Sequence, residues 1–511
     1  MPSWSRAAGR APALPAPGTD PHAAAPLDGA GGSDAAGGSR AVGAPTDASV
    51  PSVPSVAELR RRVLRLAGPI CAALVVGALA QLVVAALLGH MGDDALYVRA
   101  LFIPVTFLVL AVQEGLDVST QVGFARLRGA RDGDDAPTSA TTALLGRFVG
   151  AGAAVLGAVA LLVVLAAPAL ATVLSVPGPL VAEFVAFARW TVLASVLSVP
   201  TAVAAAALRG WGRTGASATV ALLVAGLQVL VVWLVGLVGG FGVLAVPVAI
   251  AGSTLVGAGV AWALLVRARL LPAPGRLMPG VARPGAADHR GVDVRALLLG
   301  VGLPVGLSYL LLTATNLVMV WVLGPSGTAV VAGFGGAATV QTLVVVPAIG
   351  LAAAVSIVMN QQWGAGELRL LPRTFRAGTV VVAGTYVVVG GLVLAAAPLL
   401  AGQLSADPEV AAQAALYLRV VGPSYAGVGL VLYLVTLLEQ LGYGRVAVTL
   451  NVLYHAVSLG VGGALARSGG GPIALYATIA VTNVVGLAVL LPVAVHLVRR
   501  RAGGRVGQGT P

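Results

Sequence analysis

A succession of long apolar runs, separated by short polar breaks, dominates the chain. About 20 apolar residues are what an α-helix needs to cross the hydrocarbon core of a bilayer, and most of these runs reach that length. Only 10% of the residues are charged, whereas a soluble domain carries about 25%. So few charged side chains cannot cover a water-exposed surface, and the sequence therefore predicts an all-α membrane protein whose main solvent, and partner, is the lipid bilayer.

About twelve of these runs are long enough to be transmembrane helices. Six precede a break at about 268–294 that is rich in Pro, Gly and Arg, and six follow it. The predicted spans are 66–90, 97–125, 143–171, 181–207, 215–239, 243–267, 295–323, 328–358, 377–401, 409–438, 446–466 and 472–497.

The arginines predict how these spans are oriented. They cluster in the breaks on the side where the chain begins and ends, whereas the breaks on the other side hold few arginines and more Asp and Glu. Because cytoplasmic loops carry an excess of basic residues, we expect a multi-pass protein with both termini in the cytoplasm. The net charge of +12 suits an anionic membrane surface. A nucleic-acid partner is not expected, because it would require a soluble basic face.

Composition also predicts the domain organisation. Residues 1–56 are rich in Ala, Gly, Pro and Ser, a composition that cannot form a core, so we expect a disordered cytoplasmic tail. The expected parts that follow are an N-terminal six-helix half at 57–268, a cytoplasmic linker at 269–294, a C-terminal six-helix half at 295–498 and a cytoplasmic tail at 499–511. Abundant Ala, Gly, Val and Arg, with no Lys, indicate a GC-rich bacterial genome and hence a bacterial cytoplasmic membrane.

The two halves resemble each other in sequence. Pro69 in "LAGP" matches Pro304 in "VGLP" at an offset of 235, and Gly129 in "RGAR" matches Gly364 in "WGAG" at the same offset. "AAPALATVLS" matches "AAPLLAGQLS" at an offset of 230, and "GWGR" matches "GYGR" at 232. Six spans return the chain to its starting side, so the repeats are parallel. The sequence therefore predicts two homologous six-helix bundles with a cavity between them that opens alternately to either side.

Several motifs in this order resemble the multidrug and toxic compound extrusion (MATE) family, within the multidrug, oligosaccharidyl-lipid and polysaccharide exporter superfamily. They are "LAGP", the pair "GLDVSTQVGFARLRGARDGDDA" and "GLAAAVSIVMNQQWGAGELRL", "AALRGWGRTGAS" and "GFGVLAVPVAIAGS". The resemblance covers about residues 58 to 500. It implies a twelve-helix, two-lobed cation antiporter that exports amphipathic, often cationic compounds in exchange for H+ or Na+.

The first span departs from the pattern of this family. Many members carry an Asp a few residues before the Gly that ends the first helix, but here the stretch is "QLVVAALLG" with Val84 at that position. The matching position in the second half is near Met319. Neither side chain can bind a cation, so a coupling ion would need another site.

Two carboxylates in the second span are the strongest candidates for such a site. Glu114 and Asp117 are three residues apart and so share one face of a helix. A charged side chain in the middle of a bilayer costs about 2.5–3.5 kcal/mol, which favours a place in a cavity as a cation-coupling or substrate-binding site, with Gln113 beside them. The alternative is an ordinary ion pair with Arg126 and Arg128 at the cytoplasmic end of the span.

The second half contributes further polar candidates. For Glu439 in "TLLEQLGYG" we expect a pairing with a nearby arginine, or else a coupling role. Asn316 and Asn451 are either helix–helix hydrogen-bonding residues or cavity residues. His455 lies four residues after Asn451, on the same face, and is either a packing residue or a group that titrates near neutral pH. The aromatic candidates for contact with flat cations are Tyr309, Trp321, Tyr425, Tyr433 and Tyr454.

The sequence contains no enzyme signature. A phosphate-binding "GxxxxGK[ST]" motif is missing, and the single cysteine, Cys71, can form neither a disulfide framework nor a paired-cysteine metal site. We therefore expect that the protein is not an enzyme and binds no cofactor or metal. We expect a monomeric, gradient-driven antiporter with a small-molecule substrate and with H+ or Na+ as the coupling ion. Two alternatives stay open: a flippase for a lipid-linked saccharide, which would want a basic cavity, and a non-transporting membrane scaffold.

Overall fold

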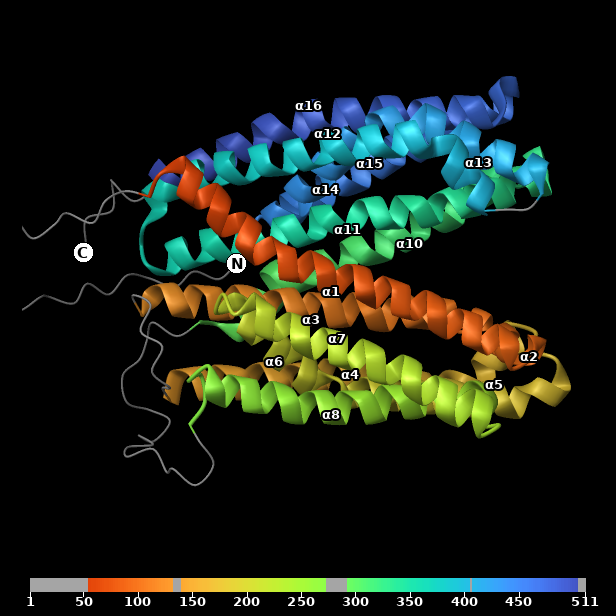
Figure 1. The fold of residues 1–511 in the computed structure, drawn as a ribbon, viewed down its shortest axis with the longest axis horizontal. Helices are drawn as coiled ribbons and strands as arrows, with labels where there is room; N and C mark the ends of the chain where they lie inside the picture. Colours follow the sequence, from red (N-terminus) through yellow and green to blue (C-terminus); the bar gives the residue numbers. More distant parts are fainter. Residues whose placement is uncertain (1–53, 132–138, 273–291, 405–406, 504–511) are drawn as a thin grey trace, which may run out of the picture. The chain divides into compact units, whose positions relative to one another are not determined.

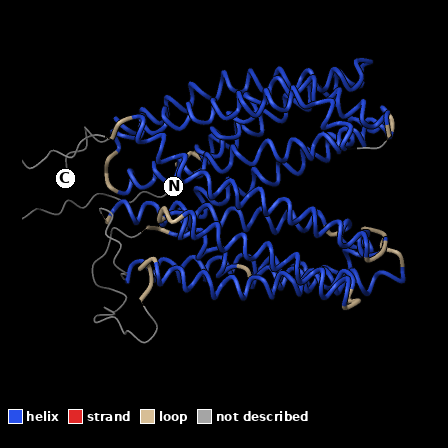
Figure 2. Tube along the Cα trace, in the orientation of Figure 1, coloured by secondary structure: helices blue, strands red, loops and turns tan. Residues whose placement is uncertain are grey.

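The computed structural model describes residues 54–131, 139–272, 292–404 and 407–503. Over these ranges the chain forms helices and no strand, which confirms the predicted all-α class (Figures 1 and 2). Most of the predicted tail at 1–56, most of the linker at 269–294 and the end of the tail at 499–511 lie outside the described residues.

The first half of the chain contains α1 to α8 (Figure 1). Their bounds are α1 Val56–His90, α2 Asp93–Leu101, α3 Ile103–Ala130, α4 Ser139–Val173, α5 Gly178–Leu197, α6 Val199–Gly210, α7 Thr214–Val231 and α8 Ala245–Arg267. The predicted second span is the pair α2 and α3, and the predicted fourth span is α5 and α6, which meet at Ser198. The start of α1 is fixed by a capping box, in which Ser55 Oγ accepts from the Glu58 N–H while Glu58 accepts from the Ser55 N–H.

The second half contains α9 to α16. Their bounds are α9 Val294–Leu297, α10 Leu303–Leu323, α11 Thr328–Gly364, α12 Leu371–Leu404, α13 Pro408–Val421, α14 Tyr425–Gln440, α15 Gly444–Leu465 and α16 Gly471–Gly503. A π-helical turn at Leu298–Gly302 joins α9 to α10, and α13 and α14 together form the predicted tenth span.

Eleven helical stretches within the described ranges are long and apolar enough to cross a membrane. The last of them, Gly444–Gly503, has 60 residues, about twice what one crossing needs. Gly469 and Gly471, with φ of 108° and 60°, interrupt it, and α15 and α16 pack against each other on either side of this turn. Counted separately, α15 and α16 bring the number of crossings to the predicted twelve.

Turns with the same backbone conformation recur in the two halves. Gly92 and Gly327, which correspond at the offset of 235, both precede a helix with positive φ, 123° and 107°. The helices α6 and α14 end in a shared pattern in which Gly212 and Gly442 have φ of 81° and 82°. These two glycines correspond at an offset of 230, so the sequence alignment of "GWGR" with "GYGR" at 232 is wrong by two positions.

The hydrophobic cores do not follow the order of the chain in two helices. The start of α1, from Leu59 to Ile70, packs in the core of the C-terminal half, whereas Val84 and Leu88 near its end belong to the core of the N-terminal half. The second-half counterpart, α9 with α10, does the reverse: Leu297, Val301 and Val305 join the N-terminal core, and Met319 joins the C-terminal one. The beginning of the first span of each half therefore packs in the hydrophobic core of the other half.

The two halves are in backbone contact at one end, where α1 begins and α16 ends, on the left of Figure 1. We call it the arginine-rich end, because Arg62, Arg126 and Arg501 lie at this contact. A Cβ atom on Gly129 would lie 1.9 Å from the carbonyl oxygen of Gln361, and one on Gly364 would lie 2.0 Å from that of Arg126. Only glycine permits this crossing of α3 and α11.

Side chains reinforce the contact at the arginine-rich end. The guanidinium groups of Arg126 and Arg501 each lie 3.9 Å from the ring centre of Trp363. Two groups cannot occupy one face at this distance, so they stack on opposite faces. Arg126 Nε also donates to Asn360 Oδ1 at 2.9 Å, and Arg62 donates to Gln361 Oε1 at 2.7 Å. These contacts join α1 and α3 to α11 and α16.

Candidate functional site

A central cavity of about 350 Å³ lies at the junction of the two halves. It is lined by α1, α3, α6 and α7 of the first half and by α10, α11, α14 and α15 of the second. Much of its lining is apolar, including Ile70, Leu74, Leu312, Ile349 and Leu432. Ionisable groups interrupt this apolar surface at a few points, which is the usual composition of a small-molecule site.

Helical periodicity explains which side chains reach the cavity. On α3, Glu114, Asp117 and Gln121 follow each other at steps of three and four residues and share one face. On α10, Ser308 lies four residues before Leu312 on the lining face. The lining residues of α11, at positions 341, 345, 349 and 353, also recur every four residues.

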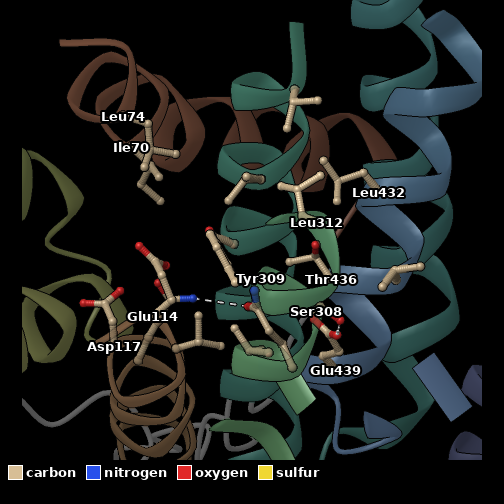
Figure 3. A pocket seen from close by; sticks show the side chains of 18 of the residues that line it. Ile70, Leu74, Glu114, Asp117, Ser308, Tyr309, Leu312, Leu432, Thr436 and Glu439 are labelled. Atoms are coloured by element: carbon tan, nitrogen blue, oxygen red, sulfur yellow. Dashed lines mark hydrogen bonds between the residues drawn. The ribbon is translucent and has the colours of Figure 1, made fainter. Parts of the chain in front are cut away.

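Two carboxylates, Glu114 and Asp117, stand on the α3 wall (Figure 3). Asp117 is ion-paired with Arg209, from the last turn of α6. Arg209 Nε also donates to Gln121 Oε1 at 3.2 Å, and its Nη1 donates to Ser217 Oγ at 3.1 Å, so three neighbours fix the guanidinium. No basic side chain of the described ranges lies within ion-pair distance of Glu114.

The partner of Glu114 is instead a hydroxyl group from the other half. Its carboxyl group faces the phenol of Tyr309 on α10 and interacts with it. The Asp117 carboxylate and the Arg209 guanidinium are close enough to act on Glu114 electrostatically. Glu114 therefore stands between the paired charges of its own half and a neutral donor of the opposite half, and it is available to a ligand.

The opposite wall carries a third carboxylate, Glu439, at the end of α14 (Figure 3). It is buried and accepts a hydrogen bond from Ser308 Oγ at 2.6 Å. Asn451 of α15 donates to the same Ser308 at 3.1 Å. Tyr454 and His455 line the cavity beside them, with their rings 5.0 Å apart and edge to face.

Amide groups link the halves at the side of the cavity that faces the arginine-rich end. Gln121 Nε2 of α3 donates to Gln440 Oε1 of α14 at 3.3 Å. Asn360 Nδ2 of α11 donates to the Gln440 carbonyl oxygen at 3.3 Å and accepts from Arg126. Gln361 Nε2 donates to the Gly210 carbonyl oxygen at 2.9 Å. These buried hydrogen bonds connect the cavity to the crossing of α3 and α11.

A second cavity, of about 290 Å³, lies inside the first half. Asp117 and Arg209 line it as well as the central cavity, so their ion pair stands between the two. Its other polar lining includes Gln81, Ser198 and Thr201. Val84, which stands where the family carries an Asp, is a buried core residue, and so is Met319.

The structure brings five of the seven candidate site residues together. The central cavity is lined by Glu114, Asp117, Glu439, Asn451 and His455. Gln113 instead donates to Ser198 Oγ at 2.9 Å, in a contact between α3 and the junction of α5 and α6. Asn316 is exposed on α10 and donates to the Leu312 carbonyl oxygen one turn earlier at 3.0 Å.

The ion pairs suggested for the carboxylates, one as an alternative and one as an expectation, are replaced by other contacts. Arg126 donates to Asn360, and Arg128 donates to the Trp211 carbonyl oxygen, while Asp117 pairs with Arg209. The expected pairing of Glu439 with an arginine is wrong for the described part of the chain, because its partner is Ser308. Of the aromatic candidates, Tyr309 and Tyr454 line the cavity, Tyr425 and Tyr433 are fully buried, and Trp321 is exposed beneath Arg467.

Sequence reasoning missed Arg209, Gln121 and Ser308. Arg209 follows the apolar run of the predicted fourth span, a position that predicts a cytoplasmic flank, but α6 continues to Gly210 and turns Arg209 toward α3. The spacing of Gln121 from Glu114, seven residues, was a usable signal for a shared helical face. No group of three or more His, Cys, Asp or Glu suitable for a metal ion occurs among the described residues.

A duplicated bundle of membrane-crossing helices, with a partly polar cavity where its halves meet, is the architecture of a secondary transporter. The MatE family model matches this chain twice, at residues 69–234 and 304–462. The chain therefore belongs to the MatE family, and the predicted resemblance is confirmed. No curated protein matches it.

Solved MATE structures share the fold. A mutant of the MATE transporter VcmN from Vibrio cholerae is 18% identical, with a TM-score of 0.77 over 87% of this chain and 98% of that chain. A MATE protein in complex with MaL6 is 20% identical, with a TM-score of 0.76 over 88% and 99%. A superfamily transporter from Pyrococcus furiosus, described as having a binding pocket of reverse polarity, is 20% identical, with a TM-score of 0.75 over 87% and 96%.

Proposed function

We propose that the protein is a gradient-driven antiporter that exports amphipathic, cationic compounds in exchange for H+ or Na+. The observation that carries this proposal is the charge of the central cavity. Among the described residues that line it, the three carboxylates of Glu114, Asp117 and Glu439 face one guanidinium, that of Arg209. The excess of negative charge suits a cation, and the apolar lining suits the rest of an amphipathic molecule.

Glu114 is the group we assign to coupling. Asp117 is ion-paired with Arg209 and Glu439 accepts a hydrogen bond from Ser308, whereas Glu114 has no basic partner among the described residues and interacts with the Tyr309 hydroxyl. A proton or Na+ on Glu114 removes the charge that attracts the substrate, so ion and substrate compete for it. Binding from one side and release on the other then follow if the halves rock about their junction.

Tyr309 and Tyr454 complete the proposed substrate site. They line the cavity on the walls formed by α10 and α15, and Tyr309 faces Glu114. Aromatic faces attract cations, with about 0.5–2 kcal/mol per contact depending on how far water is excluded. A flat cationic ring between these tyrosines would keep its charge close to a carboxylate.

The same charge balance disfavours the flippase, which would bind a phosphorylated lipid and need a basic cavity. Among the described residues, Arg209 is the one arginine that lines the cavity, and it is already paired with Asp117. A scaffold without transport would have no use for an unpaired carboxylate in a cavity, because such a group is costly in a membrane. We further propose that the arginine-rich end faces the cytoplasm of a bacterium and that the protein acts as a monomer.

Transport by purified protein in liposomes tests the proposal. An imposed pH or Na+ gradient should drive export of a fluorescent cation such as ethidium, and Glu114→Gln should lower the initial rate at least about tenfold. The matched control is Glu409→Gln, an exposed carboxylate at the start of α13 that lies outside the cavity. Equal rates with and without a gradient, or equal rates for Glu114→Gln and wild type, would exclude coupling through Glu114. Movement of a labelled lipid-linked saccharide without ethidium transport would support the flippase instead.

A further inference from the structure

At the arginine-rich end of the C-terminal half, a groove lies between the start of α12 and the end of α16. It shares no lining residue with the central cavity. We call it the α12–α16 groove; its volume is about 400 Å³. Three arginines, Arg373, Arg376 and Arg499, line it together with apolar side chains. The transport proposal uses none of these residues.

Charged and apolar groups are separated along the groove. On α12, Arg376 and Val380 are one turn apart, and Arg373 precedes them on the same face. On α16, Leu491, Val495 and Arg499 follow each other at steps of four residues. The two helices run in opposite directions, so both place their arginines at the arginine-rich end and their apolar residues deeper in the membrane.

Within the described part of the chain, no acidic side chain balances the charge of these three arginines. All three side chains are exposed, and within the described residues no carboxylate forms an ion pair with them. The apolar part of the groove is open as well, since Val380 is 43% exposed. A cluster of arginines that ends an open apolar groove at the membrane boundary has the chemistry to hold an anionic headgroup and a hydrocarbon chain at once.

We propose that the α12–α16 groove is a binding site for an anionic diacyl phospholipid. The phosphate lies among Arg373, Arg376 and Arg499, and one acyl chain follows Val380, Leu491 and Val495 toward the middle of the bilayer. In the corresponding helix of the first half, α4, the first arginine is Arg147 at the ninth residue, whereas α12 carries Arg373 and Arg376 within its first six residues. The site requires neither the proposed substrate nor the proposed coupling ion.

The position of the groove gives the lipid a structural consequence. Arg501, two residues after Arg499, stacks on Trp363 of α11. Arg126 of the first half stacks on the same ring. An anionic headgroup on Arg499 lowers the repulsion among the arginines at the end of α16 and so favours the stacked arrangement. Lipid bound at the groove should therefore stabilise the contact between the halves.

Native mass spectrometry of the purified full-length protein in detergent tests the site. Phosphatidylglycerol should bind at least about tenfold more tightly than phosphatidylcholine with the same acyl chains. Replacing all three groove arginines (Arg373→Gln, Arg376→Gln and Arg499→Gln) should weaken phosphatidylglycerol binding on the order of a hundredfold, at about fivefold per arginine. The control replaces three exposed arginines of α1 (Arg60→Gln, Arg61→Gln and Arg65→Gln), which lose the same charge and should leave the affinity within about twofold of wild type.

Further variants cover folding and the acyl chain. Arg376→Gln alone should cost about fivefold in affinity, so the proposal stays testable if the triple variant does not fold. Val380→Trp fills the groove and should weaken phosphatidylglycerol binding at least about fivefold, whereas Val388→Trp, on the exposed part of α12 outside the groove, should not. The proposal is overturned if the two lipids bind equally, if both triple variants lose affinity alike, or if inorganic phosphate at millimolar concentration displaces the lipid completely, which would make the groove a site for free phosphate.

Discussion

The Arg209 guanidinium of α6 and the Asp117 carboxylate of α3 form an ion pair between the central cavity and the smaller cavity inside the first half. In the second half, Glu439 occupies the position that corresponds to Arg209, at the offset of 230 residues that the equivalent turns define. The turn that follows is the same in both halves, with Gly212 and Gly442 at almost equal φ. The two repeats therefore present opposite charges from one backbone position.

Breaking the ion pair from one side should destabilise the protein more than removing both charges. Their side chains are only 16% and 25% exposed, and an unpaired buried charge costs up to about 3–5 kcal/mol. We expect Arg209→Gln to lower the free energy of unfolding by about 2 kcal/mol and Asp117→Asn/Arg209→Gln by less than half as much. Thermal unfolding in detergent measures this cycle, and additive losses would mean that the pair contributes nothing.

Removing the Ser308 donor alone should likewise destabilise the protein more than removing the donor together with the Glu439 carboxylate. Ser308→Ala removes the donor of a buried carboxylate, at a cost of about 1–3 kcal/mol. Since a neutral amide suffers less from the loss, Ser308→Ala combined with Glu439→Gln should be more stable than Ser308→Ala alone. Unfolding midpoints of the three variants compare them, and an unchanged midpoint for Ser308→Ala would contradict the prediction.

The crossing of α3 and α11 should not tolerate a methyl group. Gly129→Ala would bring Cβ into the carbonyl group of Gln361, so the halves must separate, at a cost of about 1–3 kcal/mol. Cross-linking of cysteines introduced into α3 and α11 near the crossing should become slower. Gly384→Ala in α12 is the matched control, because its Cβ meets no atom within 4 Å; similar cross-linking in both variants would show that the contact is not close in the membrane.

The stack of Arg126, Trp363 and Arg501 should hold the arginine-rich end together. Trp363→Ala removes two cation–π contacts, each of about 0.5–2 kcal/mol, and should speed hydrogen–deuterium exchange at the ends of α11 and α16. Trp321→Ala, which removes the exposed stack with Arg467, leaves these ends unchanged. Equal exchange in the two variants would assign no role to Trp363.

Sequence alone predicted the class, the number of crossings and the duplication, because apolar length and repeated glycines and prolines are local properties of the chain. It did not predict which face of each helix meets the cavity. Gln113 is one residue from Glu114 yet points to Ser198, since one residue turns a helix by about 100°. The second-half residue Asn316 lies on α10 like Ser308, but α10 is apolar on nearly all sides, so its pattern does not distinguish a lipid-facing side from a cavity side.

The partners of the charged residues were also beyond local patterns. Arg209 and Asp117 are 92 residues apart, and Ser308 and Glu439 are 131 apart. Such pairs form only when helices that are distant in the sequence of one half pack against each other. The error of two positions in aligning "GWGR" with "GYGR" has a similar cause, because the backbone turn, and not the letters around it, decides which residues correspond.

The exchange of helix beginnings between the two cores has a consequence for any attempt to divide the molecule. A chain cut between α8 and α9 would give two pieces, each lacking a segment of its own interior: the C-terminal piece would miss Leu59 to Ile70, and the N-terminal piece would miss Leu297 to Val305. The fragments should therefore be insoluble or degraded when made singly and be rescued when made together. Although the chain consists of two homologous halves, neither half by itself contains all the residues of its own hydrophobic core.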